Sequence, residues 1–505
     1  MKRVRERLLL AAILAMLAAS SLAEGALEEV RIGSKKFTES VILADLAAQL
    51  AVSTGAVVVH RQELGGTRLL WDALLANEID IYPEYTGTLK REILAKEDVV
   101  DEASLRRALA TRNLSMSRPL GFSNSYALGM MRQTAKRLRI ENISDLARHP
   151  ALRFGLSDEF LSREDGWPAI RLAYGLNAVN PRGMDHDIAY KGLVDGSVDV
   201  IDLYTTDPEV ANYGVETLAD DRHQFTDNQA VLIYRADLER RAPKALGAVL
   251  RLEGAIDASS MIGMNGAAKI DRRPETQVAA AFLTTSFGLA NVERGEGLTS
   301  RLARRTIEHL RLVLLSLGAA IVVALPLGVI AAKRPTLGHA ILAIASVLQT
   351  IPSLALLVFM IPIFGIGAAP AIAALFLYSL LPIIRNTASG FANIPPSLRN
   401  SAIALGLTPM QRLRLIELPL ASPAILAGMK TAAVINVGTA TLGALIGAGG
   451  YGQPIFAGVR LDNFGLILEG AVPAALLALA VQGLFELAEQ HFVPRGLRLK
   501  PNASI

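Results

Sequence analysis

The sequence predicts a two-lobed α/β domain over residues 28–295, followed by an all-α transmembrane domain over residues 300–497. Three observations carry this prediction: an apolar composition, an uneven distribution of charge, and an alternation of strand-like and helix-like segments before residue 295. The 505 residues have a mean hydropathy of +0.35, with 51% hydrophobic and 19% charged residues. Soluble enzymes and disordered chains are less apolar than this. Part of the chain is therefore expected to lie in lipid.

The charge distribution places the domain boundary near Arg301. From Arg301 onward, 205 residues contain 15 basic and 6 acidic side chains, whereas the first 300 residues contain 36 basic and 41 acidic ones. The net charge of +4 is small and divided between two unlike units, so we expect no nucleic acid partner. The absence of cysteine excludes disulfides, thiolate metal sites and thiol catalysis.

The first 23 residues have the pattern of an export signal. Four basic residues before Leu8 precede an apolar run that ends at Ala18, and Ser21-Leu22-Ala23 then offers a small-x-small cleavage site. Residues 1–23 are therefore either a cleaved signal peptide or an uncleaved signal anchor that forms a sixth span. Both alternatives place the domain at 28–295 outside the cytoplasm.

The second domain contains long stretches without Asp, Glu, Lys or Arg. A helix needs about 20 apolar residues to cross the hydrocarbon core, and the longest stretch, residues 335–384, has room for two such helices. We therefore predict five membrane-spanning helices, over residues 312–332, 338–358, 367–384, 423–448 and 465–485.

Basic residues between these helices fix the orientation. They fall on one side if the first helix runs inward, and that side is then cytoplasmic by the positive-inside rule. A cluster that begins at Arg301 disagrees, and we give precedence to the export signal. The basic residues on the cytoplasmic side are Lys333, Arg334, Arg399, Arg412, Arg414, Arg495, Arg498 and Lys500.

The first domain alternates β-like and helical patterns. A strand over residues 30–33 precedes a helix over residues 40–52, and residues 78–82 and 197–201 also have strand character. This alternation predicts parallel strands with covering helices. Two such halves would enclose a cleft for a small ligand.

Four motifs in this domain resemble those of the substrate-binding proteins of osmoprotectant importers. The resemblance implies a periplasmic-binding-protein-like fold and a ligand such as glycine betaine, choline or carnitine. The motifs, in the order of the family, are Gly33-Ser34-Lys35-Lys36-Phe37-Thr38-Glu39, Leu64-Gly65-Gly66-Thr67, Tyr82-Pro83-Glu84-Tyr85-Thr86-Gly87-Thr88 and Asp199-Val200-Ile201-Asp202-Leu203-Tyr204-Thr205-Thr206-Asp207.

The chemistry of such ligands agrees with the resemblance. A quaternary ammonium has no proton to donate, so a protein holds it with aromatic faces that contribute about 0.5–2 kcal/mol each. By similarity, Tyr85, Tyr126 and Tyr204 are the expected cage walls, and Thr67 and Thr88 are the expected donors to a ligand carboxylate. The alternative for any single tyrosine is a half-buried place in the core.

The chain departs from the family pattern at two positions. Asn228 stands where relatives often carry a cage tyrosine, and Ser40 follows Phe37-Thr38-Glu39 where many have glutamine. An amide in place of one aromatic ring of the cage, as at Asn228, is expected to weaken the binding of a bare trimethylammonium group. The alternative ligand is one with a hydrogen-bonding ring or side group, such as ergothioneine.

The second domain resembles the permease subunits of binding-protein-dependent ABC importers. These permeases dock on their ATPase through a cytoplasmic loop, which the resemblance places at residues 386–422. Asn400 stands where the family has an acid. The loop residues that match the family's spacing are Asn400, Ser401, Ala402, Gly406, Ile416, Leu418 and Pro419.

Between the two halves of this loop, Gly406 permits a bend, and Thr408 with Pro409 can begin a second helix. The alternative interpretation is an ordinary amphipathic interfacial hairpin. Two further stretches are typical of osmoprotectant permeases, 349–355 and 443–450, and their prolines and glycines predict broken helices along a translocation path.

The chain contains no G-x-x-x-x-G-K-[ST] motif, and its histidines show no metal-type spacing. We therefore expect no cofactor, no metal and no enzymatic activity, with a separate ATPase as motor. The resemblance implies a homodimer in the bacterial inner membrane, surrounded by lipid, with the binding domain in the periplasm or extracellular space. The rivals are a ligand-gated channel, which would need a selectivity-filter loop, and a membrane-anchored sensor, which would need a cytoplasmic signalling domain.

Overall fold

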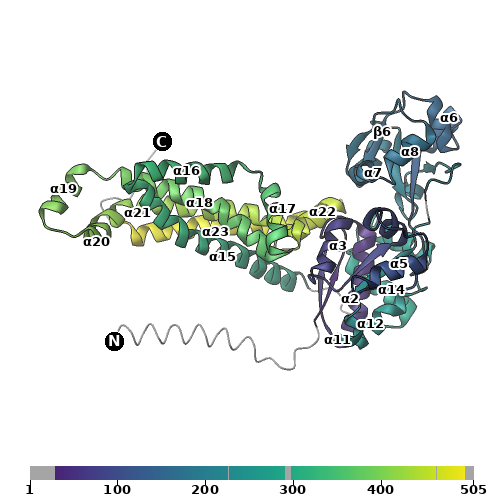
Figure 1. The fold of residues 1–505 in the computed structure, drawn as a ribbon, viewed down its shortest axis with the longest axis horizontal. Helices are drawn as coiled ribbons and strands as arrows, with labels where there is room; N and C mark the ends of the chain where they lie inside the picture. The colour runs from purple at the N-terminus through teal and green to yellow at the C-terminus, as the bar shows by residue number, and fades with distance from the viewer. Residues whose placement is uncertain (1–28, 226, 290–296, 462, 495–505) are drawn as a thin grey trace.

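The computed structural model describes residues 29–225, 227–289, 297–461 and 463–494. Figure 1 shows two parts: a domain of sheets and helices in two lobes, and an elongated bundle of helices that extends from one of these lobes. The predicted signal segment at 1–23 and the basic residues after Pro494 lie outside the described residues.

Lobe 1 is built on a mixed sheet with helices on both faces. Its strand order is β2-β1-β3-β10-β4. One face packs against α2, α12, α13 and α14, and the other packs against α3 and α5. The strands are β1 (Glu29–Gly33), β2 (Val57–Arg61), β3 (Ile81–Tyr85), β4 (Leu114–Met116) and β10 (Ala230–Arg235), and the helices are α2 (Thr38–Val52), α3 (Thr67–Leu75), α5 (Glu102–Ala110), α12 (Pro243–Val249), α13 (Ala258–Lys269) and α14 (Glu275–Phe287).

Lobe 2 has a second mixed sheet, of order β7-β6-β8-β5-β9. The chain enters this lobe between β4 and β5 and leaves it between β9 and β10, so two crossing segments form the hinge. The strands are β5 (Tyr126–Met131), β6 (Phe154–Ser157), β7 (Arg182–Met184), β8 (Val200–Tyr204) and β9 (Val215–Thr217), and the helices include α6 (Arg132–Leu138), α7 (Asp158–Ser162), α8 (Trp167–Tyr174), α9 (His186–Val194) and α10 (Glu209–Asn212).

The prediction of two α/β lobes is confirmed, but the prediction of parallel strands is wrong in part. In lobe 1, β10 runs antiparallel to β3 and β4, and in lobe 2, β5 runs antiparallel to β8 and β9. Each reversed strand directly follows a hinge crossing, so it enters its sheet from the hinge edge. The predicted strands at 78–82 and 197–201 begin three residues later, at Ile81 and Val200.

The second domain is a bundle in which α15 packs against α18, and α18 packs against α21. Within the described part of the chain, four helical segments are long and apolar enough to cross a membrane, or five if the bent pair α16 and α17 counts as one. The helices are α15 (Leu298–Lys333), α16 (Pro335–Thr350), α17 (Ser353–Phe364), α18 (Ala368–Ala392), α19 (Pro396–Ala404), α20 (Pro409–Arg412), α21 (Leu418–Thr439), α22 (Gly452–Arg460) and α23 (Phe464–Phe492).

The predicted span at 338–358 is wrong as a single helix. The chain bends by 100° between α16 and α17. Ile351 is held in an extended conformation, with ψ of 127°, because Pro352 disfavours the helical conformation in the residue before it. The broken helix that the sequence predicts around Pro352 is therefore present, within the predicted span.

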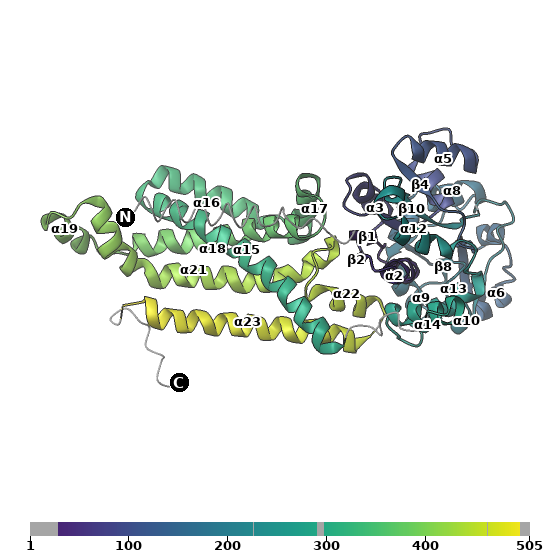
Figure 2. The same ribbon diagram turned by 90° about the horizontal axis from the view of Figure 1, so that it is seen from below.

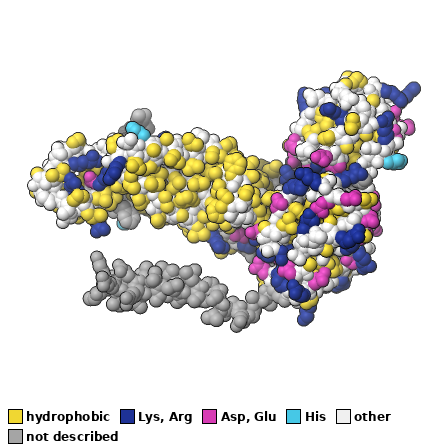
Figure 3. Space-filling model, in the orientation of Figure 1, with side chains coloured by type: hydrophobic (Ala, Val, Ile, Leu, Met, Phe, Trp, Pro, Cys, Tyr) yellow, Lys and Arg dark blue, Asp and Glu magenta, His cyan; other side chains and the backbone are white. Residues whose placement is uncertain are grey.

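The two ends of the bundle differ in charge and in what they contact. Figures 1 and 2 show α19 and α20 at the end far from the two-lobed domain, and Figure 3 shows basic side chains there beyond the apolar middle. At the near end, three of the arginines that disagree with the positive-inside rule are ion-paired, and Arg304 contacts Glu308. Arg301 and Arg305 contact Glu469 at 3.0 and 2.5 Å, which offsets their charge on that side.

Candidate functional site

An aromatic cluster lies where the two lobes meet. The ring of Tyr204, at the end of β8, is 4.9 Å from that of Tyr126 and 5.9 Å from that of Phe37. Phe37 precedes α2 and lies 6.3 Å from Tyr85, at the end of β3. The three predicted cage tyrosines therefore form one chain of rings, with Phe37 as the link between lobe 1 and lobe 2.

Two cavities border this cluster. The larger, of about 670 Å³, is lined by Phe37, Glu39 and Tyr204 and extends between the lobes to the helical bundle. The smaller, of about 20 Å³, is lined by Thr88, Tyr126, Asn228 and Arg163. A cavity of the smaller size holds one water molecule. A solute can therefore reach the inner face of Tyr126 only when the lobes separate further.

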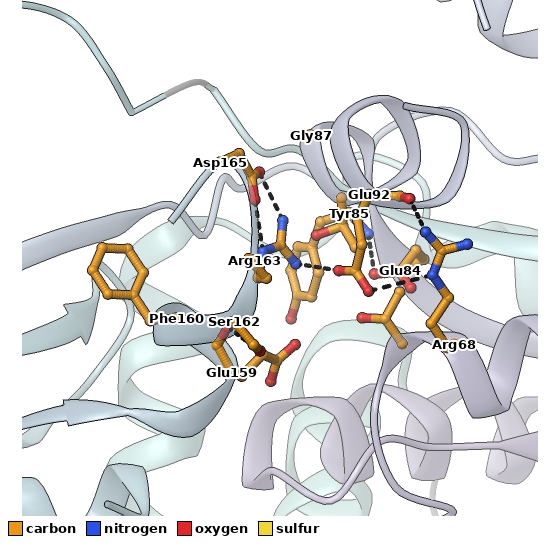
Figure 4. Close-up of polar contacts among 12 residues, drawn as sticks. Arg68, Glu84, Tyr85, Gly87, Glu92, Glu159, Phe160, Ser162, Arg163 and Asp165 are labelled. Atoms are coloured by element: carbon orange, nitrogen blue, oxygen red, sulfur yellow. Dashed lines mark hydrogen bonds and ion pairs between the residues drawn. The ribbon is translucent and has the colours of Figure 1, made fainter. Parts of the chain in front are cut away.

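Ion pairs between and beside the lobes surround the smaller cavity (Figure 4). Arg163 of lobe 2 contacts Glu92 of lobe 1 at 2.6 Å and Asp165 at 2.8 Å, and its side chain is only 7% exposed. Its guanidinium carbon lies 5.6 Å from the ring centre of Tyr126. A cation of the protein thus already lies over one predicted cage wall.

Thr67 and Tyr85 are packed inside lobe 1 and border neither of these cavities. Lys35 joins them, because its Nζ donates to Thr67 Oγ1 at 2.9 Å and lies 5.6 Å from the ring centre of Tyr85. The same ammonium is ion-paired with the buried Glu84 at 2.5 Å. The hydroxyl of Thr67 therefore accepts from Lys35, and its role as a donor to a ligand carboxylate stays a prediction.

Asn228 lies on the second hinge crossing, and its amide is bound to backbone. Its Oδ1 accepts from the backbone N–H of Gly87 at 2.8 Å and of Thr88 at 3.3 Å, and its Nδ2 donates to the carbonyl of Asn124 at 2.9 Å. Asn228 thus holds the hinge against the turn after β3. The alternative of a ligand with a hydrogen-bonding ring stays a prediction.

Glu39 forms a hydrogen-bonded centre between the lobes. Its Oε1 accepts from Tyr85 Oη at 2.5 Å and Asn124 Nδ2 at 2.8 Å, and its Oε2 accepts from Thr206 Oγ1 at 2.6 Å and Asn265 Nδ2 at 2.9 Å. Burial raises the pKa of this carboxyl, against the four hydrogen bonds, which lower it. Thr206 belongs to lobe 2, so the carboxylate connects both lobes. It also orients Tyr85, a predicted cage residue, through the hydrogen bond to the Tyr85 hydroxyl.

The predicted coupling loop is an exposed helical hairpin at the far end of the bundle. Asn400, Ser401 and Ala402 lie on α19, and Gly406 follows it with φ of 74°, in the left-handed region that favours glycine. Thr408 caps α20, accepting from the backbone N–H of Gln411, with Pro409 at the first helical position. Ile416 lies in the continuation toward α21, and Leu418 and Pro419 begin that helix.

Family models match both halves of the chain. Residues 28–285 match the substrate-binding domain of ABC-type glycine betaine transport systems, and residues 324–496 match the inner-membrane component of binding-protein-dependent transport systems. The chain belongs to the osmoprotectant ABC importers. It joins their binding domain and their permease in one polypeptide, so the prediction of a fused importer subunit is confirmed.

Individual relatives agree with this assignment. The choline transport system permease protein of Bacillus subtilis is 42% identical over 197 residues, which are 39% of this chain and 91% of that protein. An osmoprotectant import permease protein of Salmonella typhimurium is 42% identical over 202 residues, 39% of this chain and 94% of that one. A solved structure described as a glycine betaine/carnitine/choline ABC transporter is 26% identical, with a TM-score of 0.44. The match extends over 51% of this chain and 98% of that chain.

This osmoprotectant importer is thus a transporter subunit and a multi-pass protein of the inner membrane. Its coupling region contains an acid that sequence reasoning did not assign a role. Glu417, only 8% exposed, contacts Lys333 at the end of α15 at 2.9 Å and Arg399 of α19 at 3.8 Å. The carboxylate therefore connects the predicted ATPase-docking helix α19 to the membrane helix α15.

We expect Glu417→Gln to reduce ATP-driven uptake by several-fold while solute binding stays unchanged. The neutral amide leaves Lys333 and Arg399, which are partly exposed, without a counter-charge, a loss of up to about 1 kcal/mol for such ion pairs. Uptake and binding by the same reconstituted preparation measure the effect. Glu216→Gln, which breaks an exposed pair with Arg132, is the control, and equal losses in the two variants would contradict the role of Glu417.

His186 is a further residue that the sequence did not single out. Its ring lies 4.7 Å from that of Tyr204, and its Nε2 is 2.9 Å from Asp207 Oδ2. Burial lowers the pKa of His186, but the charges of Asp207 and Asp202 and the hydrogen bond to Asp207 raise it to about 9. At neutral pH the imidazolium is therefore charged beside Tyr204, a predicted cage residue.

We expect the thermal stability of the importer to fall as the pH rises above about 6.5. A histidine whose pKa is raised on folding stabilises the fold fully below its unfolded pKa and loses that contribution through its folded value, here about 9. The contribution is at most about 3 kcal/mol. Melting curves at pH 6.5 and 9.5 measure it, and His186→Gln should flatten the difference.

The control for this series is His223→Asn in the same lobe, at an exposed position with φ of 53°, which asparagine tolerates. This variant should keep the full pH dependence of the melting temperature. The same slope in His186→Gln and in the unmodified chain would contradict the assignment.

Among the residues that sequence reasoning missed as site residues, Lys35, Phe37 and Glu39 lie inside the first family motif, so a signal was present. Arg163 and His186 lie in segments without a motif. Only the folding of lobe 2 brings their side chains to Tyr126 and Tyr204.

Proposed function

We propose that this chain captures a quaternary-ammonium compatible solute, such as glycine betaine, choline or carnitine, outside the cell and passes it through its own membrane helices. The observation that carries the proposal is the chain of rings formed by Tyr85, Phe37, Tyr204 and Tyr126 at the junction of the lobes. Aromatic faces are the groups that bind a cation with no proton to donate.

A separate ATPase drives the transport. The hairpin of α19 and α20 is exposed, carries the family spacing from Asn400 to Pro419, and lies at the end of the bundle opposite the binding domain (Figure 2). With the binding domain outside the cell, this end faces the cytoplasm, where nucleotide is present. Asn400, Ser401, Gly406, Ile416, Leu418 and Pro419 supply the docking surface, and Ala402, which is 1% exposed, packs beneath it.

A second copy of the chain and lipid cover the apolar outer faces of the bundle. The helix α23 supports this, because in its apolar window only 6% is buried inside the chain, against 56% for α18. Large side chains along α23, such as Leu476 and Leu479, are 60% and 64% exposed. A homodimer gives each complex two tethered receptors, at an effective concentration in the millimolar range, on the order expected for short linkers.

The site itself is proposed to combine cage walls and polar partners. Tyr126 and Tyr204 are the walls that contact the trimethylammonium, and Tyr85, which is packed inside lobe 1, supports them through Phe37. Thr88 faces the smaller cavity, where a ligand carboxylate could accept its hydrogen bond. When the lobes separate, Arg163 loses its ion pair with Glu92 and becomes a charged partner for the same ligand carboxylate. Thr67 and Asn228 contribute by holding Lys35 and the hinge.

A titration of the full chain in lipid nanodiscs tests the proposed ligand class. Glycine betaine, choline, carnitine and ergothioneine are added in turn, and binding is followed by calorimetry. At least one of the first three should bind with a dissociation constant below 1 mM, on the order of −4 kcal/mol or better. Failure of all four, in a preparation with intact melting behaviour, would contradict the proposed ligand class.

A further inference from the structure

Three segments of the permease contact lobe 1 of the binding domain. Ile366, in the turn between α17 and α18, belongs to the apolar cluster under α3, and Leu461, after α22, belongs to the cluster around α2. At Gly447, a Cβ would lie only 2.5 Å from Leu64 Cδ2 of lobe 1. The backbone of Gly447 is therefore so close to Leu64 that a side chain at this position would clash. The contact is therefore a packed interface.

Arg460, the last residue of α22, is the polar centre of this interface. Its Nη2 is 2.5 Å from Glu63 Oε1, its Nη1 is 2.6 Å from Glu275 Oε1, and its Nη1 also donates to Thr38 Oγ1 at 2.8 Å. All three partners belong to lobe 1. One guanidinium thus contacts the loop after β2 and the first residues of α2 and α14.

Water is largely excluded from this cluster. The side chain of Arg460 is 10% exposed, and those of Glu63 and Glu275 are 16% and 10% exposed. Burial lowers the pKa of the guanidinium, but Glu275 and Glu63 raise it, so Arg460 stays charged. A buried charge that loses its partner is costly. The cluster therefore favours this relative position of the two domains over positions in which the charges are unpaired.

The backbone of Glu63 supports a specific role. Glu63 has φ of 59°, in the left-handed region that is unfavourable for residues with a side chain. Such a conformation persists where the surroundings demand it, and it is common at sites of function. Here the residue in this conformation is Glu63, whose carboxylate accepts hydrogen bonds from Nε and Nη2 of Arg460.

The same contact adjoins the solute site. Thr38, which accepts from Arg460, lies between Phe37 and Glu39, and these two residues line the larger cavity with Tyr204. Across that cavity, residues of α9 in lobe 2 face Phe456 and Val459 of α22. In Figure 1, lobe 1 lies against the bundle, whereas the helices α6, α7 and α8 of lobe 2 stand away from it.

We propose that Arg460 docks lobe 1 on the permease, so that lobe 1 stays fixed when solute enters and lobe 2 alone moves. The acceptor is the acidic pair Glu63 and Glu275 of the same chain. Through Thr38, the docked arginine connects the residues beside the solute to α22, and the cavity between the lobes opens toward the membrane helices. The docking does not depend on which solute the importer takes.

Distance measurements between spin labels test this proposal. The chain has no native cysteine, so pairs of cysteines at exposed helical positions label it without background. Arg107 on α5 reports on lobe 1, Leu172 on α8 reports on lobe 2, and Ala303 on α15 reports on the permease. Labelled chain is diluted with unlabelled chain in nanodiscs, so that distances within one chain dominate.

The expected result has two parts. The distance between positions 107 and 303 should have a narrow distribution that glycine betaine, choline or carnitine leaves unchanged, whereas the distance between 172 and 303 should shift with the solute that binds. Without any solute, Arg460→Met should broaden the first distribution several-fold. Glu63→Gln combined with Glu275→Gln should broaden it in the same way from the other side of the interface.

Arg118→Met is the matched control, because it breaks an ion pair with Glu253 on the exposed surface of lobe 1 and should leave both distributions unchanged. The ligand-free distance between positions 107 and 172 should stay unchanged in the docking variants, which shows that their binding domain is folded, while uptake falls at least tenfold. An unchanged distance between 107 and 303 in both docking variants would overturn the proposal. The ligand-free arm reports on docking even if none of these solutes binds.

Discussion

Tyr204→Ala should raise the dissociation constant for the solute by at least 30-fold. The ring of Tyr204 contacts Tyr126, Phe37 and His186 and borders the larger cavity, so its removal opens the centre of the cage. A cation over an aromatic face is stabilised by about 2 kcal/mol when water is excluded, and 1.4 kcal/mol is a factor of ten in affinity. Calorimetric titration of the chain in nanodiscs measures the loss.

Two controls separate the ring from its hydroxyl group and from the fold. Tyr204→Phe keeps the aromatic face and loses only the contact of 3.3 Å with the hydroxyl of Tyr126, so affinity should fall less than fivefold. Leu172→Ala, at a position of lobe 2 that is 81% exposed and borders neither cavity, should bind as the unmodified chain does. Circular dichroism should be the same for all three variants. Unchanged affinity in Tyr204→Ala would remove this residue from the site.

Glu39→Gln should weaken solute binding by about tenfold and lower the melting temperature. The carboxylate accepts two hydrogen bonds on each oxygen, and an asparagine amide donates on both sides, Asn124 to Oε1 and Asn265 to Oε2. In either orientation, the new amide nitrogen therefore faces an N–H donor. An unsatisfied buried group costs about 1–3 kcal/mol, and the contact to Thr206 that connects the lobes depends on the same carboxylate.

A second substitution offers a rescue. In the double variant Glu39→Gln with Asn124→Asp, the amide and the carboxylate exchange places, so the hydrogen bond between the two positions can form again. Affinity should recover by several-fold relative to Glu39→Gln alone. Glu102→Gln, which breaks an exposed pair with Arg106, is the neutral control. A double variant weaker than both single variants would show that position 39 requires an acid for another reason.

Segments whose role is set by local sequence could be predicted. The Thr408 cap, the left-handed Gly406 and the helix break before Pro352 follow from the backbone preferences of those residues. The apolar stretches likewise marked the membrane helices, because a chain that enters lipid must satisfy its backbone hydrogen bonds internally. The predicted second span was wrong as a single helix, because the length of an uncharged stretch shows how much chain lies in the membrane, whereas Pro352 sets where that chain bends.

Features that depend on distant parts of the chain were not predictable. The antiparallel direction of β5 and β10 follows from the two hinge crossings, and no local pattern encodes it. Arg163 and Glu92 are separated by 71 residues in the sequence, and Arg460 and Glu63 by 397. Both pairs join parts of the molecule that the sequence analysis treated as independent, so neither could appear as a motif.

Transport by purified chain in sealed proteoliposomes tests the central claim most directly. The chain is reconstituted with its partner ATPase, and uptake of radiolabelled glycine betaine, choline and carnitine is measured with ATP, without ATP, and without the ATPase. We expect at least one of these solutes to accumulate above its external concentration only when both ATP and the ATPase are present. Solute flux that proceeds equally in all three conditions, and stops when the two concentrations are equal, would contradict the account and indicate a channel.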